Sequence, residues 1–294
     1  MAVKRWLVGC IVLFLGTLAT VSLAFLIVNL SLEREGFALG PLSKRVGLVE
    51  IIGDIESSEN VVDQLEHMRL DTSVRAVVLR LDSPGGGVAA SQEIYEAVRK
   101  VRDADKPVVA SMGGVAASGA YYIACAADSI MSNPGTLTGS IGVIMSFPNT
   151  EELFRKVGVR FEVVKTGKFK DIGSLSRPMT PEERQLLQET LSSVYEQFVN
   201  AIAEGRGLDR RDILPYADGR IFSGDQAHDL GFVDRLGDLN DAIQLAATMA
   251  DIKGRPVVVR KVRRRMSLID LFQEKLNLVP GLSRSGPSLE YRLR

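Results

Sequence analysis

The chain has 294 residues and a hydrophobic content of 46%, which suits one large globular domain or two small ones together with a membrane segment. Its 36 basic and 36 acidic residues give a formal net charge of zero, so no overall field favours nucleic acid or an acidic partner. There are two cysteines, and Cys10 falls in an apolar run, so Cys125 is expected to be a small buried residue without an intrachain disulfide.

The first predicted element is a membrane-spanning helix over residues 6–30. This run, WLVGCIVLFLGTLATVSLAFLIVNL, contains no charged residue. At a rise of about 1.5 Å per residue it is longer than the hydrocarbon core, which is roughly 30 Å thick. The alternative is a cleaved signal peptide, whose apolar region is about 7–15 residues long. Lys4 and Arg5 precede the run, so residues 1–5 are expected in the cytoplasm and the rest of the chain on the other side of the membrane.

Residues 31–44 are a polar linker, and the segment after it predicts an α/β domain over residues 45–260. Strands and helices alternate there, which is typical of a mostly parallel sheet with crossover helices. The predicted elements are a strand from Arg45 (RVGLVEIIGDI), a helix over Ser57–Asp71, a strand over Arg75–Leu81, a glycine loop at 82–87 and a helix over Val88–Val101.

The segment from Asp105 to Val143 holds the candidate nucleophile. A short apolar strand is predicted over Val108–Met112, and a helix is predicted over Ser118–Ala127. Between them, the sequence GGVAASGA places Ser118 among residues with almost no side chain. A serine at such a strand-to-helix turn can present its hydroxyl to a substrate whose backbone approaches closely. The alternative is an N-cap serine in a small-residue packing contact.

The second half of the domain is predicted to contain a long capped helix. Thr180 and Glu183 form a capping box with Pro181 at the first helical position, and Gly205 is expected to end the helix. The other predicted elements are helices over Glu151–Val157 and Asp238–Ala250, a short helix capped by Ser223 and Gln226, strands over Arg160–Val164 and Val257–Arg260, and a polar loop over Lys165–Pro178. Residues 261–294 form a tail that is basic at first and then carries a short apolar helix over Leu268–Leu276.

The sequence offers few candidates for a general base. His67 and His228 are predicted on helix surfaces away from the glycine-rich turns, so a Ser-His-Asp triad lacks its base. No His, Cys, Asp or Glu cluster has metal-ligand spacing, and neither a metal nor a cofactor is expected.

Lysine is the remaining candidate base. The polar loop holds Lys165, Lys168 and Lys170 in KTGKFKD, and their spacing does not choose among them. A lysine base must first lose its own proton, although its ordinary pKa is about 10.4, and this requires burial away from water and carboxylates.

The SPGGG loop is the candidate oxyanion hole. It follows a strand and opens a helix, but it lacks both the dinucleotide-binding fingerprint and the Walker lysine. The backbone amides of Gly85 and Gly86, with that of Gly119, are candidate donors to an oxyanion. A plain strand-to-helix turn is the alternative interpretation.

Five motifs together resemble the signal peptide peptidase A family, peptidase family S49. They are DSPGGG, GGVAASGAYYIACAAD, TGSIGV, GKFKD and FSGDQAHDLGFVDRLGDL, and the likeness covers Val46 to Met249. The family consists of membrane-tethered serine peptidases with the fold of the Clp protease and crotonase superfamily. The resemblance therefore implies that α/β fold for residues 45–260.

The resemblance also implies roles for particular residues. Ser118 matches the nucleophile and Lys170 the general base. Ser140, in TGSIGV, matches a serine that orients the lysine, and Gly85 and Gly86 match the oxyanion loop. In double-length relatives the lysine and the serine come from different halves of one chain. A single-length chain like this one is then expected to complete its site between neighbouring copies in a dome-shaped homo-oligomeric ring.

The function expected from the sequence is that of a serine endopeptidase anchored in a bacterial inner membrane. Its domain would lie on the extracytoplasmic, periplasmic side and degrade cleaved signal peptides and similar hydrophobic peptides. One alternative is an acyl-CoA hydratase or hydrolase on the same fold, and another is a non-catalytic membrane scaffold. We also consider that the C-terminal residues enter a neighbour's active site as a product-like peptide.

Overall fold

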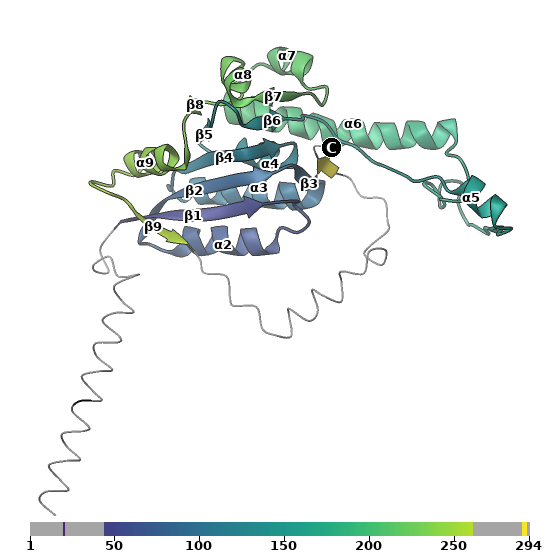
Figure 1. Cartoon of the computed structure of the whole chain (residues 1–294), viewed down its shortest axis with the longest axis horizontal. Coiled ribbons are helices and arrows are strands. Elements are labelled where there is room, and N and C mark those ends of the chain that lie inside the picture. The colour runs from purple at the N-terminus through teal and green to yellow at the C-terminus, as the bar shows by residue number, and fades with distance from the viewer. Residues whose placement is uncertain (1–19, 21–43, 261–289, 293–294) are drawn as a thin grey trace, which may run out of the picture. The chain divides into compact units, whose positions relative to one another are not determined.

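The computed structural model describes Thr20, residues 44–260 and residues 290–292. The expected membrane helix at 6–30 and the expected tail helix at 268–276 lie outside the described residues. Within the described part of the chain, no helix is both long and apolar enough to cross a membrane. The chain divides into two units, residues 1–43 and 44–294, and the second contains every labelled helix and strand of Figure 1.

The main sheet has eight strands, of which one neighbouring pair is antiparallel and the others are parallel. The strands are β1 (Arg45–Ile52), β2 (Val74–Ser83), β4 (Val108–Ala117), β5 (Ser129–Ser132), β6 (Leu137–Gly139), β7 (Ile221–Ser223), β8 (Arg235–Leu236) and β9 (Val257–Arg260). The main path runs β7-β6-β4-β2-β1-β9, while β5 pairs with β4 and with β8. The sheet therefore confirms the predicted α/β class with a mostly parallel sheet.

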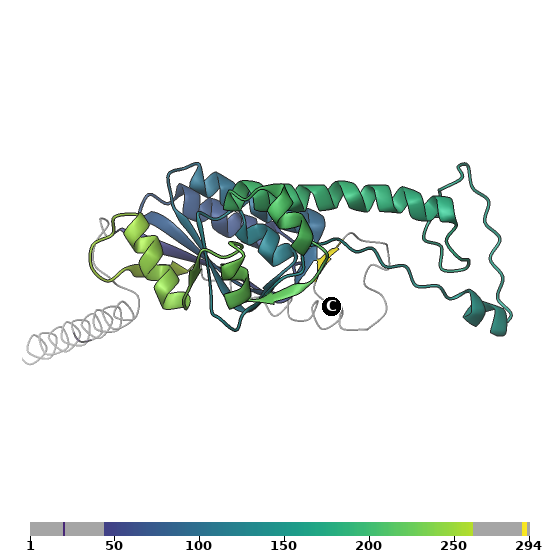
Figure 2. The ribbon, with the colours of Figure 1, turned by 90° about the horizontal axis from the view of Figure 1, so that it is seen from above.

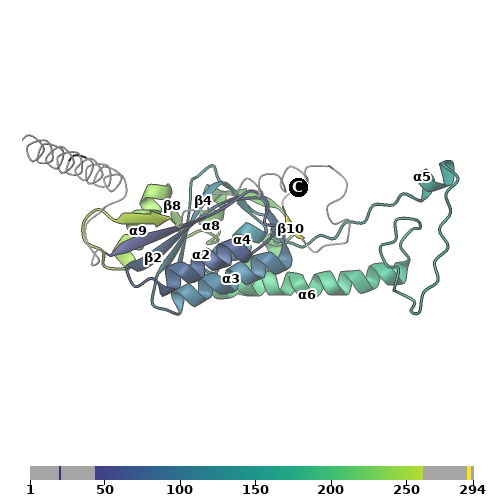
Figure 3. The ribbon, with the colours of Figure 1, turned by 90° about the horizontal axis from the view of Figure 1, so that it is seen from below.

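Helices cover both faces of this sheet (Figures 1 and 3). The helices are α2 (Glu59–Leu70), α3 (Val88–Arg102), α4 (Gly119–Ala124), α5 (Glu151–Lys156), α6 (Pro181–Arg206), α7 (Arg210–Ile213), α8 (Gly224–Asp229) and α9 (Leu239–Met249), with a 3₁₀ turn at Leu214–Tyr216. Successive residues of β2 point to opposite faces. Val77 and Leu79 join the core that includes side chains of α2, α3, α4 and α6, whereas Ala76 and Val78 join the smaller core with α9. Burial on both faces explains the near-continuous apolar run in RAVVLRL.

The parallel arrangement brings three sequence motifs to one edge of the sheet. Strand β2 ends at Ser83 before the short strand β3 (Gly85–Gly87), β4 ends before Ser118, and β6 ends before Ser140. In the register, Ser83 lies beside Ala116 and Ala117 lies beside Gly139. Because ligands of parallel sheets bind outside the carboxyl ends of the strands, this edge is the expected place for a site.

Two expected elements in the second half of the domain differ from the structure. The strand predicted at Arg160–Val164 is wrong for the single chain: the segment is exposed and pairs with no strand in the described residues. Helix α6 does not end at Gly205 but at Arg206, followed by Gly207 in the left-handed conformation. A Cβ at Gly205 would lie 2.1 Å from the carbonyl oxygen of Cys125, so this glycine permits a close approach instead of ending the helix.

Residues 145–180, here called the arm, run out along the N-terminal half of α6 and past its outer end, where α5 lies (Figures 2 and 3). The arm contains α5 and the polar loop with the three candidate lysines. It exposes many large apolar side chains, which is unusual for a surface that faces only water. They are Leu153, Val157, Val159, Phe161, Val163, Val164, Phe169 and Leu175.

Candidate active site

Ser118 occupies a strained turn between β4 and α4. Its φ and ψ angles are 54° and −117°, a conformation that costs a non-glycine residue on the order of 1–3 kcal/mol. The backbone is held on both sides, because its N–H donates to the Gly139 carbonyl at 2.8 Å and its carbonyl accepts from the Tyr122 N–H at 2.8 Å. The residue is 1% exposed, and its Oγ has no hydrogen-bond partner in the described structure. A buried hydroxyl without a partner is rare and is a candidate for contact with a ligand.

The last described strand, β10 (Glu290–Arg292), lies against the glycine motif. It pairs antiparallel with β3, and Tyr291 lies opposite Gly86. An extended segment therefore adds to this edge in the way that peptides add to exposed sheet edges. The expectation placed the C-terminal residues in a neighbour's site, whereas here they pair with the glycine strand of the same chain.

The carbonyl oxygen of Tyr291 lies between two glycines of the site. A Cβ on Gly85, whose φ is +103°, would be 2.0 Å from this oxygen and 2.8 Å from the backbone nitrogen of Gly119. A Cβ on Gly119 would be 3.2 Å from the same oxygen. Only glycine at these positions admits a carbonyl so close to the residue that follows Ser118.

The glycine amides differ in what they bind. The Gly85 N–H donates to Ser83 Oγ at 3.1 Å, and the Gly87 N–H donates to the Ile55 carbonyl at 2.8 Å. Gly85 therefore contributes space and not a donor to the candidate oxyanion hole. The remaining candidates are Gly86, opposite Tyr291, and Gly119, at the first position of α4, where a helix has no internal acceptor for the N–H.

The Tyr291 side chain is buried in an aromatic cluster with Tyr122 and Phe198, next to Gly119. Its ring stacks on Tyr122 with centroids 5.3 Å apart and lies 4.8 Å from the ring of Phe198, while its hydroxyl donates to the Val194 carbonyl at 3.2 Å. Burial raises the pKa of Tyr291 well above the ordinary tyrosine value. Sequence reasoning missed this residue because nothing local marks a partner about 200 residues away.

Ser140, like Ser118, has a positive φ directly after the end of a strand. Its φ is 52°, its N–H donates to the Arg220 carbonyl at 2.8 Å, and it is 7% exposed. It lines a cavity of about 580 Å³, together with residues 141–144, 217–219 and the α6 side chains Gln188, Leu191, Ser192 and Tyr195. No lysine of the described chain lines this cavity.

Lys170 is not brought to Ser118 within one chain. It is exposed on the arm, where the neighbouring Lys168 pairs with Glu182 in the first turn of α6. Ser118 lies instead near Phe198, which contacts Tyr122 of α4. Phe198 lies fifteen positions after Glu183 in α6, which is a distance of roughly 22 Å at 1.5 Å per residue. The structure thus places Ser118, Ser140, Gly85, Gly86 and Gly119 at one sheet edge and leaves Lys170 apart.

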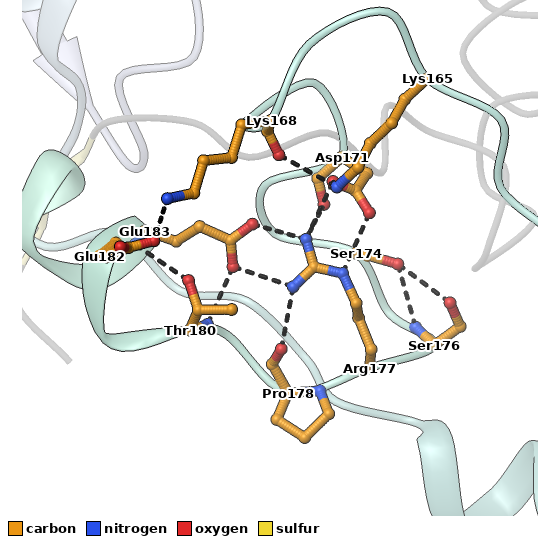
Figure 4. A network of polar contacts seen from close by, with 10 residues as sticks. All are labelled: Lys165, Lys168, Asp171, Ser174, Ser176, Arg177, Pro178, Thr180, Glu182 and Glu183. Carbon is orange, nitrogen blue, oxygen red and sulfur yellow. Dashed lines mark hydrogen bonds and ion pairs between the residues drawn. The ribbon is translucent and has the colours of Figure 1, made fainter.

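The three lysines of the arm differ in their partners. Lys165 donates to Asp171 Oδ1 at 2.5 Å, and Lys168 pairs with Glu182 (Figure 4). The ammonium group of Lys170 makes no ion pair or hydrogen bond within the described residues. A base amine must be free of carboxylates, and among the three lysines, which their spacing left equivalent, Lys170 is the one whose amine meets no carboxylate in the described residues.

Other candidate groups do not join the site. His67 and His228 are exposed on α2 and α8, as predicted. Cys125 is a fully buried free thiol, and burial raises its pKa to about 12. No group of His, Cys, Asp or Glu in the described residues has the arrangement of a metal site.

Comparisons with known proteins identify similar sequences. The model of peptidase family S49 matches residues 100–253, and that of Clp protease matches residues 43–136. A Synechocystis protein named "Putative protease" is 46% identical over 71% of this chain and 76% of its own length. An Enterococcus faecium protein named "Putative signal peptide peptidase SppA" is 40% identical over 63% of this chain, which spans about half (54%) of its length. A ClpP1 mutant of Listeria monocytogenes is 20% identical with a TM-score of 0.45, covering 67% of this chain and 94% of that one.

Proposed function

The chain belongs to peptidase family S49, and we propose that it is a serine endopeptidase whose Ser/Lys active site is completed by a neighbouring copy. One observation carries the proposal. Ser118 lies in a strained turn, and its buried hydroxyl has no hydrogen-bond partner among the described residues. The glycines next to it admit the carbonyl of an extended segment. A hydroxyl and a carbonyl held in this way are the reacting groups of acyl transfer.

The proposed reaction proceeds through an acyl-enzyme. Ser118 Oγ attacks the scissile carbonyl while the Lys170 amine takes its proton, and the amides of Gly86 and Gly119 donate to the oxyanion. The C–N bond then breaks, and the lysine returns the proton to the leaving amine. Water, deprotonated by the same amine, attacks the serine ester; the ester C–O bond then breaks, the lysine returns the proton to Ser118 Oγ, and the acid is released. Ser140, at the neighbouring strand end, holds the lysine amine by a hydrogen bond.

The arm supports a site shared between copies of the chain. It carries Lys170 away from the Ser118 of its own chain and exposes a large set of apolar side chains. No lysine among the described residues lines the cavity beside Ser140. We propose that a second copy covers the arm in a homo-oligomeric ring and that its Lys170 enters this region. Burial there would lower the pKa of the amine toward that of an effective base.

The substrates are proposed to be cleaved signal peptides and other hydrophobic peptides. The aromatic cluster around Tyr291 suits a large apolar side chain, and the antiparallel pairing of β10 with β3 suits an extended peptide. The uncharged run at residues 6–30 supports single-pass anchoring in a bacterial inner membrane, with residues 1–5 in the cytoplasm and the peptidase domain in the periplasm.

The test is mass spectrometry of the products of a hydrophobic peptide incubated with the full chain in detergent. The wild type should give internal cleavage products, and Ser118→Ala and Lys170→Ala should each abolish them. The matched controls are Ser193→Ala and Lys100→Ala, which alter exposed residues on α6 and α3. Turnover of an acyl-CoA thioester in place of the peptide would favour the hydratase or hydrolase alternative. Unchanged peptide cleavage in Ser118→Ala would refute the proposed mechanism.

A further inference from the structure

Arg177 lies at the centre of a network of ion pairs at the outer end of α6 (Figure 4). Its Nε donates to Asp171 Oδ2 at 3.0 Å, and its two terminal nitrogens donate to the two carboxylate oxygens of Glu183 at 2.9 and 2.5 Å. It also donates to the backbone carbonyl of Pro178 at 3.1 Å. A planar guanidinium bound in this way fixes the relative position of both carboxylates.

Glu183 is the fixed end of the network. It is 3% exposed, and its side chain accepts the Thr180 N–H at 2.9 Å, while Thr180 Oγ1 accepts the Glu183 N–H at 3.2 Å. Hydrogen bonds from Arg177 and from the Thr180 backbone lower the pKa of Glu183 to about 2. Arg177 therefore ties Asp171 to the first turn of a long helix.

Asp171 follows Lys170 directly in the chain, and both of its oxygens are occupied. Among the described residues, the charged groups in contact with it are Arg177 and Lys165. Hydrogen bonds from these two cations, with Arg177 the larger contributor, hold the pKa of Asp171 far below its ordinary value. The remaining charged groups of the network, Lys168 and Glu182, pair with each other.

We propose that Arg177 is a positioning residue for Lys170. It fixes the turn that carries Lys170, and it occupies the adjacent carboxylate that would otherwise pair with the amine and keep it protonated. This inference rests on the proposed function, in which Lys170 is the base. A carboxylate within about 4–6 Å favours the charged form of an amine and raises its pKa.

The test is the pH dependence of kcat for the full chain, with assembly checked by size-exclusion chromatography. Arg177→Gln frees Asp171 Oδ2 while Lys165 keeps Oδ1, so the midpoint at which activity rises with pH should move up by about one unit. At a fixed pH on that rising limb, kcat should fall about tenfold, because the neutral fraction of the amine falls tenfold. Adding Asp171→Asn to Arg177→Gln removes the competing carboxylate and should return the midpoint to the wild-type value.

Two further variants separate charge from position. Arg177→Lys keeps a cation beside Asp171, but a lysine cannot also bind both carboxylate oxygens of Glu183. The pH midpoint of kcat should therefore be unchanged, while kcat itself falls. Arg211→Gln removes a comparable Arg–Asp pair, with Asp209 at 2.8 Å on the exposed helix α7, and should change neither quantity.

The outcomes distinguish this inference from the proposed function. If Lys170→Ala is inactive but Arg177→Gln keeps the wild-type midpoint and kcat, the positioning role is wrong and the Ser/Lys mechanism stands. If Lys170→Ala is active, both the Ser/Lys mechanism and the positioning role of Arg177 are wrong. Should Arg177→Gln fail to fold or assemble, Arg177→Lys decides: an unchanged kcat in an assembled ring overturns the inference.

Discussion

Gly85→Ala tests whether the glycine edge is the place where a carbonyl is attacked. The added Cβ would lie 2.0 Å from the Tyr291 carbonyl oxygen and 2.8 Å from the Gly119 nitrogen. Carbon atoms do not approach oxygen so closely, so a carbonyl at this position must move by at least roughly 1 Å. A displacement of about 1 Å from the reacting geometry can cost on the order of 100-fold in rate. A carbonyl moved in this way would also leave the amides of Gly86 and Gly119, and loss of one oxyanion donor costs about 100- to 1,000-fold in kcat.

The variant also forces alanine into a positive φ, which must be separated from the steric effect. Gly85 has a φ of +103°, and an alanine there should lower stability by about 1–3 kcal/mol. Gly53→Ala is the matched control, because Gly53 has a φ of +77° and a Cβ there meets nothing within 4 Å. Both variants carry the cost of a positive φ, and Gly85→Ala should lose more stability because only its Cβ also meets Tyr291 and Gly119.

The assay is steady-state cleavage of a fluorogenic hydrophobic peptide, together with thermal unfolding of each variant. We expect kcat to fall at least about 100-fold in Gly85→Ala and by less than about twofold in Gly53→Ala. Equal kcat values for the two variants would refute the assignment of the glycine edge to the oxyanion site.

Three other predictions concern the tail, the core and the network on the arm. Deletion of residues 290–294 should lower the KM for a peptide, because β10 occupies the edge where a substrate strand would pair; an unchanged KM would contradict this competition. Phe198→Ala should lower the free energy of unfolding by about 3–5 kcal/mol in urea denaturation, because the ring is fully buried among Tyr121, Tyr122 and Tyr291, and a loss below 1 kcal/mol would contradict it. Because the pKa of Glu183 is lowered in the folded state, its contribution to stability should be complete above its ordinary value of 4.5 and lost as the pH falls through about 2; Glu183→Gln should remove this dependence, as measured by urea denaturation across that range.

Local signals made part of this structure predictable from sequence. The capping boxes of Thr180 with Glu183 and of Ser223 with Gln226 are both formed as predicted, since each depends on hydrogen bonds between residues three positions apart. The turn at Ser118 was likewise recognisable, because glycine and alanine leave room around one hydroxyl.

Long-range pairing explains what the sequence did not predict. Residues 160–164 have the β-branched pattern of a strand, but a strand requires a partner, and the described chain supplies none. The glycine motif was expected to be a loop and is instead strand β3, because β10 and Ile55 pair with it. No local sequence pattern shows that β10 or Ile55 pairs with the glycine motif.

The spacing of the three lysines did not choose among them, and the resemblance chose Lys170; the structure adds a difference in their partners. Lys165, Lys168 and Lys170 share one short polar segment, and their chemistry is identical in sequence. They differ only in whether a carboxylate meets the amine, which depends on how the arm folds against α6.

The central claim is that Ser118 of one copy works with Lys170 of another, and complementation between two inactive variants tests it most directly. Ser118→Ala and Lys170→Ala chains are co-expressed in equal amounts and purified as mixed assemblies. With random mixing, a shared site has an intact serine beside an intact lysine in about one quarter of cases, so about one quarter of wild-type peptidase activity should return. A site built within one chain lacks one of the two groups in every copy. Activity no higher than that of the single variants, in assemblies shown to contain both chains, would contradict the account.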